Sequence, residues 1–428
     1  MAEICVLGLG YVGLPTASLL ANAGFQVLGV DIDADIVSRL NTGQTRLEEA
    51  GLSTLVSAAV RSGNLVAATK LEASNAFIIC VPTPITKKKG VDLRAVESAA
   101  RAIGTVIKKG DLVILESTSP VGTTRDVVGK ILSDSGLKPG LDFSLCYCPE
   151  RVLPGNTVNE LIGNDRIIGG VTPQSAQAAA VIYERFSHGK LSLTDDRTAE
   201  MCKLMENTCR DVNIALANVF ARIAEDSGVN VWEAIALANL HPRVKILNPG
   251  PGVGGHCIPV DPCFLIESFP RHTSLLRAAR ETNDSQAHRI LERMWLTTKL
   301  KQGDKLCILG AAYKADIDDP RESPSALLAK DAEKNGLIVS VHDPMVSPGK
   351  HHGLMISNDL AACLNGAAGA VLMTEHKPYR SLSAKFFAEH MSGRLIADTR
   401  NWLNHKSLRQ AGFTVVVVGV SQALMGGM

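Results

Sequence analysis

Short apolar runs alternate with helical stretches along the first part of the chain. Residues 3–7 (Glu-Ile-Cys-Val-Leu) predict a buried strand, and apolar positions at helical spacing follow over residues 14–23 as far as Gly24. Strands that alternate with helices predict a parallel sheet covered on both faces. The other segments of this alternation are strands at 26–30, 76–81, 112–115, 143–147 and 166–169, and helices at 93–107 and 173–186.

The pattern changes after Thr194. Residues 198–228 and 274–299 show long helical periodicity, and a glycine-rich loop lies between them. Long helices of this kind often provide a subunit interface. These two stretches therefore predict a helical middle domain.

A third region begins at residue 305 and resembles the first in pattern. Buried strands are predicted at residues 305–309, 337–341, 369–373, 394–397 and 414–418. The sequence therefore predicts an α/β fold in which a helical middle domain joins two Rossmann-like, doubly wound domains. The expected domains are residues 1–195, 196–300 and 301–428.

The composition is that of a globular enzyme. The chain has 428 residues, of which 20% are charged and 46% apolar, and its formal net charge is +1. This balance gives no reason to expect nucleic acid or a membrane as a partner. No apolar stretch is long enough to span a bilayer, and the first residues lack the flanks of a signal peptide. The 10 cysteines are scattered without zinc-site spacing, so we expect a reduced, cytoplasmic protein with no bound metal.

The turn after the first predicted strand has the glycine spacing of a dinucleotide site. Three glycines open the next helix, and Asp31 ends the following strand. The first glycine permits a tight turn, the second admits a pyrophosphate, and the third lets the helix pack on the strand. A carboxylate at residue 31 accepts ribose hydroxyls and repels a 2′-phosphate, so NAD is favoured over NADP. A glycine turn without a ligand is the alternative. The expected cofactor residues here are Gly8, Gly10, Tyr11, Val12, Gly13 and Asp31.

Two threonines follow other predicted strands. Thr83 lies in Val81-Pro82-Thr83-Pro84, and Thr118 lies in Glu116-Ser117-Thr118-Ser119-Pro120. Ligands of such sheets bind beyond the carboxyl ends of the strands. Both threonines are therefore candidates for contacts to the cofactor or to water, and ordinary turn formation is the alternative.

One face of the predicted helix at 198–228 carries polar residues. Lys203 and Asn207 are four residues apart, and Arg210 lies near the same face. A cation beside a neutral donor suits an oxyanion site, in which Lys203 stabilises an alkoxide and Asn207 adds a hydrogen bond. A polar stripe exposed to solvent is the alternative.

Cys257 lies in the glycine-rich loop between the long helices, in Gly252-Val253-Gly254-Gly255-His256-Cys257. A nicotinamide enzyme that stops at a ketone needs no thiol. One that carries an alcohol to the acid can hold the aldehyde on a thiolate and then form a thioester. Asp261 is a candidate acid–base partner. A buried structural cysteine is the alternative, and a zinc site with nearby histidines is disfavoured because no second thiol lies at motif spacing.

Glu150 follows a predicted strand in Cys148-Pro149-Glu150-Arg151-Val152. A carboxylate at that place can activate the water that hydrolyses a thioester. Arg151 is a candidate for holding the sugar or the phosphate of a substrate. A surface pair is the alternative for both side chains.

Together these segments resemble the nucleotide-sugar 6-dehydrogenases, the superfamily of UDP-glucose and UDP-N-acetylhexosamine dehydrogenases, over nearly the whole chain. The matching motifs are GLGYVGLPTA from Gly8, ESTSPVGTT from Glu116, CPERVLPGN from Cys148, EMCKLMENTCRDVNIA from Glu200, HPRVKILNPGPGVGGHCIPVDP from His241 and YKADIDDPRESP from Tyr313. The resemblance implies two NAD-dependent oxidations at C6 of a UDP-sugar. Cys257 is then the nucleophile, Lys203 the acid–base and oxyanion residue, and Glu150 the base for thioester hydrolysis.

The resemblance also assigns supporting roles. Asn207, Asp261 and Thr118 match residues that assist catalysis, and Arg321 matches a cofactor contact. The C-terminal domain is expected to bind the UDP-sugar, and the protein is expected to be a homodimer whose sites the neighbouring subunit completes, through the segment of His241. The residues that match substrate contacts are Arg151, Val152, Lys203, Asn207, Arg210, His241, Arg243, Gly254, Tyr313, Lys314 and Arg400.

Two positions bear on the sugar. Arg151 stands where UDP-glucose dehydrogenases carry an aromatic residue, and His256 precedes the cysteine as in acetamido-sugar enzymes. The expected substrate is UDP-N-acetyl-D-mannosamine, with UDP-N-acetylglucosamine and UDP-glucose as alternatives. Two other functions stay open, a single-step 3-hydroxyacid dehydrogenase and an NAD-dependent sensor without enzymatic activity. Cys257 and the third domain disfavour the first, and the many polar residues of the expected site disfavour the second.

Overall fold

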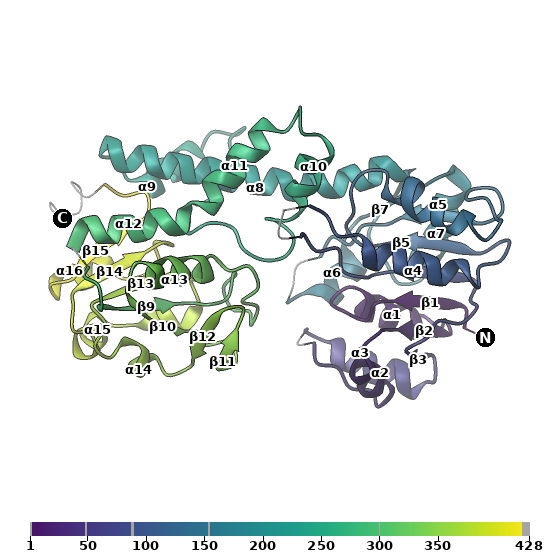
Figure 1. Cartoon of the computed structure of the whole chain (residues 1–428), viewed down its shortest axis with the longest axis horizontal. Helices are drawn as coiled ribbons and strands as arrows, with labels where there is room; N and C mark the ends of the chain where they lie inside the picture. The colour runs from purple at the N-terminus through teal and green to yellow at the C-terminus, as the bar shows by residue number, and fades with distance from the viewer. Residues whose placement is uncertain (1, 48, 87–89, 153–154, 299, 422–428) are drawn as a thin grey trace. The chain divides into compact units, whose positions relative to one another are not determined.

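The computed structural model describes residues 2–47, 49–86, 90–152, 155–298 and 300–421. The chain divides into two units (Figure 1). The first comprises residues 1–206 with 263–268, and the second comprises residues 207–262 with 269–428. The domain boundaries expected from the sequence stay a prediction.

The first unit is built on an eight-stranded sheet in the order β3-β2-β1-β4-β5-β6-β7-β8. The first six strands are parallel in the order 3-2-1-4-5-6, which is that of a Rossmann fold. β7 pairs antiparallel with β6 and parallel with β8. The strands are β1 (Ile4–Leu7), β2 (Val27–Val30), β3 (Leu65–Ala68), β4 (Ala76–Ile79), β5 (Leu112–Leu115), β6 (Ser144–Tyr147), β7 (Arg166–Gly170) and β8 (Leu191–Asp195).

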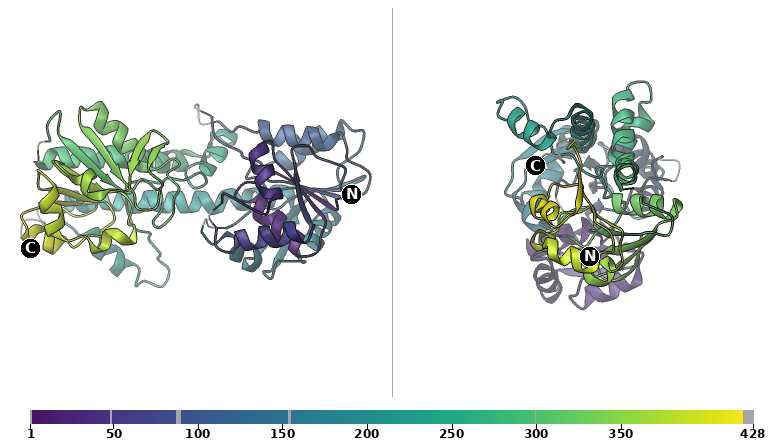
Figure 2. Two further views of the ribbon diagram at one scale, coloured as in Figure 1. Left: turned by 90° about the horizontal axis from the view of Figure 1, so that it is seen from below. Right: turned by 90° about the vertical axis from the view of Figure 1, so that its left-hand side faces the viewer.

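Helices cover both faces of this sheet (Figure 2). Ile4 and Val6 of β1 pack with α1, α3 and α7, whereas Cys5 and Leu7 pack with α4 and α5 on the other face. A strand with apolar residues on both sides reads as a continuous apolar run, which is why the sequence predicted it. The helices are α1 (Gly13–Asn22), α2 (Ala34–Asn41), α3 (Leu52–Arg61), α4 (Arg94–Gly104), the π-helix η1 (Thr123–Gly129), α5 (Lys130–Ser133), α6 (Thr157–Gly163) and α7 (Pro173–Tyr183).

The second unit contains a seven-stranded sheet in the order β11-β12-β10-β9-β13-β14-β15. Among the described strands of this second sheet, only the edge strand β11 is antiparallel, and the other six again follow the order 3-2-1-4-5-6. The strands are β9 (Lys305–Leu309), β10 (Ile338–His342), β11 (Gly349–His351), β12 (Leu354–Ser357), β13 (Gly369–Leu372), β14 (Leu395–Asp398) and β15 (Thr414–Val417).

The helices of the second unit also lie on both sheet faces. Leu306 and Ile308 of β9 belong to one core, and Cys307 and Leu309 belong to the other. The helices are α9 (Val231–Ala238), α11 (Ser274–Asp284), α12 (Gln286–Thr298), α13 (Pro324–Lys334), α14 (Leu360–Leu364), the 3-10 helix η2 (Lys377–Ser381), α15 (Ala384–His390) and α16 (His405–Gln410). Two Rossmann-like sheets with helical segments between them in the sequence confirm the predicted fold class.

Two helices belong to both units. α8 (Asp196–Ser227) begins in the first unit and continues in the second, as the sequence predicted for a helix at 198–228. α10 (Asp261–Ser268) has Asp261 and Pro262 in the second unit and its other residues in the first.

One helix was predicted with the wrong extent. The stretch 274–299 reads as a single helix, but the structure ends α11 at Asp284 and begins α12 at Gln286. The Thr282 carbonyl accepts hydrogen bonds from the Arg222 guanidinium at 2.9 Å and from the Ser285 hydroxyl at 3.0 Å. Side chains that take up a helix carbonyl interrupt the regular backbone ladder, and no glycine or proline marks this break.

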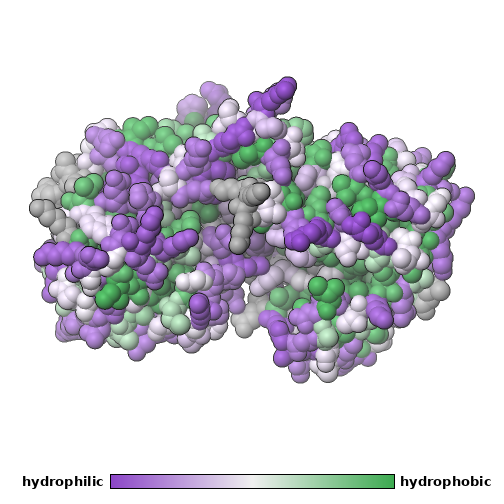
Figure 3. Space-filling model, in the orientation of Figure 1, coloured by the Kyte–Doolittle hydropathy of each residue, from purple (hydrophilic) through white to green (hydrophobic). Residues whose placement is uncertain are grey.

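No helix in the described part of the chain is long and apolar enough to cross a membrane. Hydrophilic residues cover much of the face shown in Figure 3, and hydrophobic residues lie among them in small groups.

Candidate active site

The glycine turn after β1 has the geometry of a nucleotide site. Gly8 has a φ of +91°, and its N–H donates to the Val30 carbonyl at 2.8 Å. A Cβ on Gly13 would overlap the Gly8 carbonyl oxygen, so this glycine allows α1 to pack on the turn. A Cβ on Gly10 would meet no atom within 4 Å. The turn therefore leaves open space at the N-terminal end of α1, where helix N–H groups favour an anion.

Asp31 is held in place at the end of β2. Its Oδ2 accepts the Leu9 N–H at 2.8 Å, and its Oδ1 accepts the Asp33 N–H at 2.9 Å. Each carboxylate oxygen keeps a further lone pair, which can accept a ribose hydroxyl. Tyr11 and Val12 lie between the open glycine and α1, and Tyr11 is exposed. These residues fit NAD, and their individual contacts stay predictions.

The loops that follow β4 and β5 are tied together. The Thr83 hydroxyl donates to the Thr118 carbonyl at 2.7 Å, and the Ser117 hydroxyl donates to the Val81 carbonyl at 2.7 Å. The strand order reverses between β1 and β4, which is where such sheets bind ligands. The structure thus brings the two predicted threonines together at the edge of the sheet that also carries the glycine turn.

The second sheet has a matching turn. Gly310 follows β9 with a φ of +96°, its N–H donates to the His342 carbonyl at 2.8 Å, and the Ala311 N–H donates to Asp343 Oδ2 at 2.7 Å. Burial alone would raise the pKa of Asp343, but hydrogen bonds from His376 and from backbone N–H groups lower it to about 2. This fully buried carboxylate accepts its hydrogen bonds from groups of the protein. It therefore differs from Asp31 of the first turn, which is partly exposed.

In the first unit, Lys203 lies beside the Glu150 loop. Lys203 is 6% exposed, and its Nζ donates to the Glu150 carbonyl oxygen at 2.6 Å. Burial raises the pKa of the Glu150 carboxyl, while Lys203 and the Val152 N–H act in the opposite direction. A carboxylate whose pKa is raised is a stronger proton acceptor than an ordinary one, and the buried ammonium lies beside it. This part of the polar stripe on α8 is buried rather than exposed to solvent.

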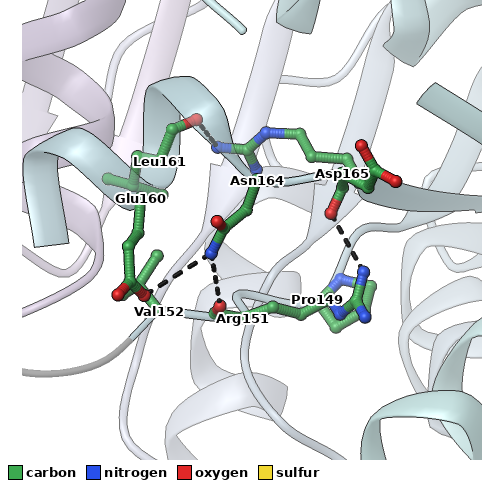
Figure 4. Close-up of a pocket in the computed structure, with 8 residues that line it drawn as sticks. Pro149, Arg151, Val152, Glu160, Leu161, Asn164 and Asp165 are labelled. Atoms are coloured by element: carbon green, nitrogen blue, oxygen red, sulfur yellow. Dashed lines mark hydrogen bonds between the residues drawn. The ribbon is translucent and has the colours of Figure 1, made fainter. Parts of the chain in front are cut away.

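The Glu150 loop is fastened to the chain between α6 and β7. Arg151 pairs with Glu206 at 2.6 Å and donates to the Asp165 carbonyl at 2.9 Å, and the Asn164 amide donates to the Arg151 carbonyl at 3.2 Å. Figure 4 shows the contacts of Arg151 with Asp165 and with Asn164 around a small pocket. The lining residues are Pro149, Arg151, Val152, Glu160, Leu161, Asn164, Asp165 and Arg166.

In the second unit, Asn207 lies beside the Cys257 segment. The Asn207 amide donates to Asp261 Oδ2 at 2.5 Å, and Asp261 is 2% exposed. The Cys257 carbonyl accepts the Val260 N–H at 3.0 Å and the Asp261 N–H at 2.9 Å. The half-buried cysteine therefore lies in the tight turn that leads into α10.

The glycines before Cys257 are required by close packing. A Cβ on Gly254 would lie 2.7 Å from both the Glu322 carbonyl oxygen and the Cβ of Tyr313. Gly255 has a φ of +87°, and a Cβ there would lie 2.9 Å from the Tyr313 ring. The Gly255 N–H donates to the Arg321 carbonyl at 3.2 Å. The loop thus rests on the segment that carries two predicted binding residues.

Arg400 lies just beyond β14, next to the start of the same loop. Its Nε pairs with Glu375 at 3.0 Å, and a Cβ on Gly250 would lie 2.6 Å from its Nη1. Four other predicted substrate residues are exposed. Arg210 lies on α8, His241 and Arg243 on the loop after α9, and Lys314 after Tyr313.

Sequence reasoning missed Glu200, which is fully buried on α8. Its Oε2 accepts the Gly122 N–H at 2.5 Å, and its Oε1 accepts the Thr124 N–H and hydroxyl, each at 2.7 Å. These bonds hold the loop that follows Thr118. The partners of Glu200 are mainly backbone groups, which leave no pattern in the sequence. The available signal was a glutamate at a position of α8 where the helical periodicity places apolar residues.

The fold and the site define a nicotinamide-dependent oxidoreductase with two nucleotide-binding sheets. Three domain models of the UDP-glucose/GDP-mannose dehydrogenase family match the chain: the NAD binding domain at residues 2–187, the central domain at 197–285 and the UDP binding domain at 307–405. The chain therefore belongs to the UDP-glucose/GDP-mannose dehydrogenase family. This confirms the predicted family, the enzyme class and NAD as the cofactor.

Three similar proteins illustrate the match. The UDP-N-acetyl-D-mannosamine dehydrogenase of Methanococcus maripaludis is 44% identical, over 97% of this chain and 97% of its own. The NDP-N-acetyl-D-galactosaminuronic acid dehydrogenase of Ralstonia nicotianae is 45% identical, over 95% of this chain and 97% of its own. The solved UDP-D-ManNAc dehydrogenase of Pyrococcus horikoshii has a TM-score of 0.91 and 39% identity, over 97% of this chain and 99% of its own.

The buried Glu200 predicts a pH dependence of stability. Burial raises its pKa from 4.5 to about 7 despite the three donors. Because the folded-state pKa is raised, the stabilising contribution is present below about pH 4.5 and is lost as the pH rises to about 7. We expect this group to remove on the order of 2 to 3 kcal/mol from the free energy of unfolding over that window.

Urea unfolding of the wild type, Glu200→Gln and Glu184→Gln across this pH range tests the prediction. The exposed Glu184 is the control. We expect the wild type and Glu184→Gln to lose stability in parallel and Glu200→Gln to lose less. A Glu200→Gln profile parallel to the wild type would show that Glu200 keeps its ordinary pKa.

Proposed function

We propose that the protein is an NAD-dependent 6-dehydrogenase that oxidises UDP-N-acetyl-D-mannosamine to UDP-N-acetyl-D-mannosaminuronate. The observation that carries this proposal is the contact of Asn207 with Asp261 beside Cys257, in a chain of this family. The names of two of the similar proteins support the mannosamine epimer. One relative is named for an N-acetylgalactosaminuronic acid, so that epimer is included in the test below.

The first step is the oxidation of the C6 alcohol to an aldehyde. NAD⁺, when bound, accepts a hydride from C6 in each of the two oxidations. The Lys203 ammonium already donates to the Glu150 carbonyl, and its other N–H groups stabilise the alkoxide as the alcohol proton passes to solvent water. Asn207 keeps a second amide N–H beside the one bound to Asp261, and it donates to the same oxygen.

The second step holds the aldehyde on the protein. The Cys257 thiolate forms a bond to C6, and the aldehyde oxygen takes a proton from Lys203, which gives a thiohemiacetal. Loss of that proton and of the second hydride from C6 leaves a thioester on Cys257. The carbon is then at the oxidation level of the acid.

Hydrolysis releases the product. Glu150 accepts a proton from water as the water oxygen bonds to the thioester carbon. The C–S bond breaks, the sulfur leaves as the Cys257 thiolate, and a carboxylate is formed. The sum is one sugar alcohol, two NAD⁺ and one water consumed for one uronate, two NADH and three protons.

We propose that Arg151 and Val152 contact the sugar, and that Tyr313, Lys314 and Arg400 contact the UDP group. The cofactor contacts are proposed for the glycine turn, Asp31, Thr83, Thr118 and Arg321. The match of the UDP binding domain over residues 307–405 supports the nucleotide assignment.

We further propose that the protein is a homodimer in the cytoplasm. Large apolar side chains on α8, on α9 and just after α9 are exposed by 37–78%, which is typical of a surface that a partner covers. They are Leu216, Val219, Ile223, Leu237 and Leu240. The loop that follows α9 carries His241 and Arg243, which we propose to reach the neighbouring subunit's site. The buried free thiols Cys5, Cys146 and Cys148 suit a reducing compartment.

The two-step reaction predicts a fixed stoichiometry. Incubation with NAD⁺ and UDP-N-acetyl-D-mannosamine should yield two NADH for each uronate, and Cys257→Ser should lose at least 100-fold in uronate formation while it still binds NAD⁺. Parallel incubations contain UDP-N-acetylglucosamine, UDP-N-acetylgalactosamine or UDP-glucose. One NADH per sugar with aldehyde as the product would refute the mechanism, and preference for another sugar would refute the substrate.

The proposed dimer predicts that a charge on its apolar surface separates the subunits. The variant Ile223→Asp places a carboxylate on this surface, at a residue of α8 that is 55% exposed. Leu327→Asp is the matched control, since Leu327 is 51% exposed on α13. Light scattering should give twice the chain mass of 45.5 kDa for the wild type and the control, and a mostly monomeric mass for Ile223→Asp. A monomeric wild type, or a dimeric Ile223→Asp, would contradict this interface.

A further inference from the structure

The segment that carries Cys257 is anchored to α8 at both ends. At its end, Asp261 accepts the hydrogen bond from Asn207. At its start, the Gly250 N–H donates to Asn218 Oδ1 at 2.9 Å. Asn207 and Asn218 are about three helical turns apart, so they lie on the same face of α8. Two asparagines therefore hold the entry and the exit of the loop that contains the proposed nucleophile.

Gly250 is bound through both of its backbone groups. Besides the bond from its N–H, its carbonyl accepts the Gln286 side-chain amide at 3.1 Å. Asn218 is fully buried, and Gln286 is 2% exposed. Water does not reach these groups to replace a lost partner, so the position of Gly250 depends on the two amides.

Asn283 determines the orientation of Asn218. The Asn283 amide N–H donates to the Asp211 carboxylate at 2.9 Å and to the Asp211 carbonyl at 3.0 Å, which leaves the Asn283 Oδ1 as an acceptor. The Asn218 amide N–H donates to that Oδ1 at 3.0 Å. Asn218 must therefore direct its own Oδ1 at the Gly250 N–H. Each residue of this chain of hydrogen bonds donates to the next, from Gly250 through Asn218 and Asn283 to the Asp211 carboxylate. The Arg280 guanidinium also donates to that carboxylate, at 2.6 Å.

α11 also limits the path of the loop by contact. Gly252 has a φ of +118°, and a Cβ there would lie 2.7 Å from the Asn283 carbonyl oxygen. The same residue thus orients Asn218 through its side chain and packs against the loop through its backbone. Beyond this point the segment is rich in glycine, so its own backbone contributes little stiffness.

We propose that Asn218, oriented by Asn283, is a positioning residue for Cys257. It fixes the start of the nucleophile loop through Gly250, as Asn207 fixes the end through Asp261. This inference rests on the proposed function, in which the Cys257 thiolate captures an aldehyde. With the first anchor removed, the first hydride transfer continues, but the aldehyde leaves the site before the thiolate bonds to it.

The test is aldehyde capture by the Asn218→Ala variant in the full-length enzyme. Reactions contain NAD⁺, UDP-N-acetyl-D-mannosamine and semicarbazide, and mass spectrometry measures the semicarbazone and the uronate. We expect uronate formation to fall by about tenfold or more, because a shift of about 1 Å can cost 10²-fold. We expect the semicarbazone share to rise, with the KM values for NAD⁺ and the sugar within about twofold of the wild type.

The matched control is Asn213→Ala on the same helix, whose amide donates to the Cys209 carbonyl and thiol one turn earlier, within α8 itself. Asn213→Ala should behave as the wild type. Asn218→Ser is a second, smaller change that should shift the product ratio in the same direction if Asn218→Ala does not fold. A loss of folded enzyme lowers the two products together, so the ratio separates positioning from stability.

The outcomes distinguish this inference from the function on which it rests. Undiminished uronate formation by the Cys257→Ser variant would overturn the proposed function and the inference with it. A wild type that needs Cys257, together with Asn218 variants that keep the wild-type product ratio, would overturn the inference alone.

Discussion

A row of polar side chains runs along one face of α8, and each must find a partner inside the protein. Its members fall within an arc of roughly 100° on the helix. A buried polar group without a partner costs about 1 to 3 kcal/mol. The row can be buried only because a loop or a neighbouring helix supplies each partner. The members are Asp196, Glu200, Lys203, Asn207, Asp211, Asn218 and Glu225, with partners at Arg125, Gly122, Glu150, Asp261, Arg280, Gly250 and Arg289 respectively.

The loops bound in this way are those that carry the proposed chemistry. In the first unit, Glu200 and Lys203 hold the loops after β5 and β6, which contain Thr118 and Glu150. In the second unit, Asn207 and Asn218 hold the two ends of the Cys257 segment. The positions of the proposed catalytic groups therefore depend on the hydrogen bonds that the polar side chains of α8 require. A substitution in α8 should shift the loops that these side chains bind.

Much of the fold could be predicted from the sequence because the central strands are apolar on both sides. β1, β4 and β5 are fully buried and appear as unbroken apolar runs. The edge strands β3, β8 and β11 were not predicted, since their residues alternate in burial or are largely exposed. The break between α11 and α12 could not be predicted either, because it depends on Arg222 of α8, which is far away in the sequence.

Candidate site residues could be named from the sequence where residue type and spacing together indicate a chemical role. The glycine turn with Asp31, the pair Lys203 and Asn207, and the loop of Cys257 each have a pattern that relates residue type to a role. Glu200 and Asn218 have none, because their partners, which include backbone N–H groups, lie far away in the sequence. A buried asparagine and an exposed one look the same in a helical sequence, and only the fold tells them apart.

Rapid-quench mass spectrometry of the Glu150→Gln variant tests the covalent mechanism most directly. The variant is mixed with NAD⁺ and UDP-N-acetyl-D-mannosamine, quenched in acid after NADH has formed, and digested. Without the proposed base, we predict that the thioester accumulates and that the peptide containing Cys257 gains the mass of the UDP-sugar acyl group. An unmodified Cys257 peptide at a time when two NADH per site have formed would contradict a thioester on this residue.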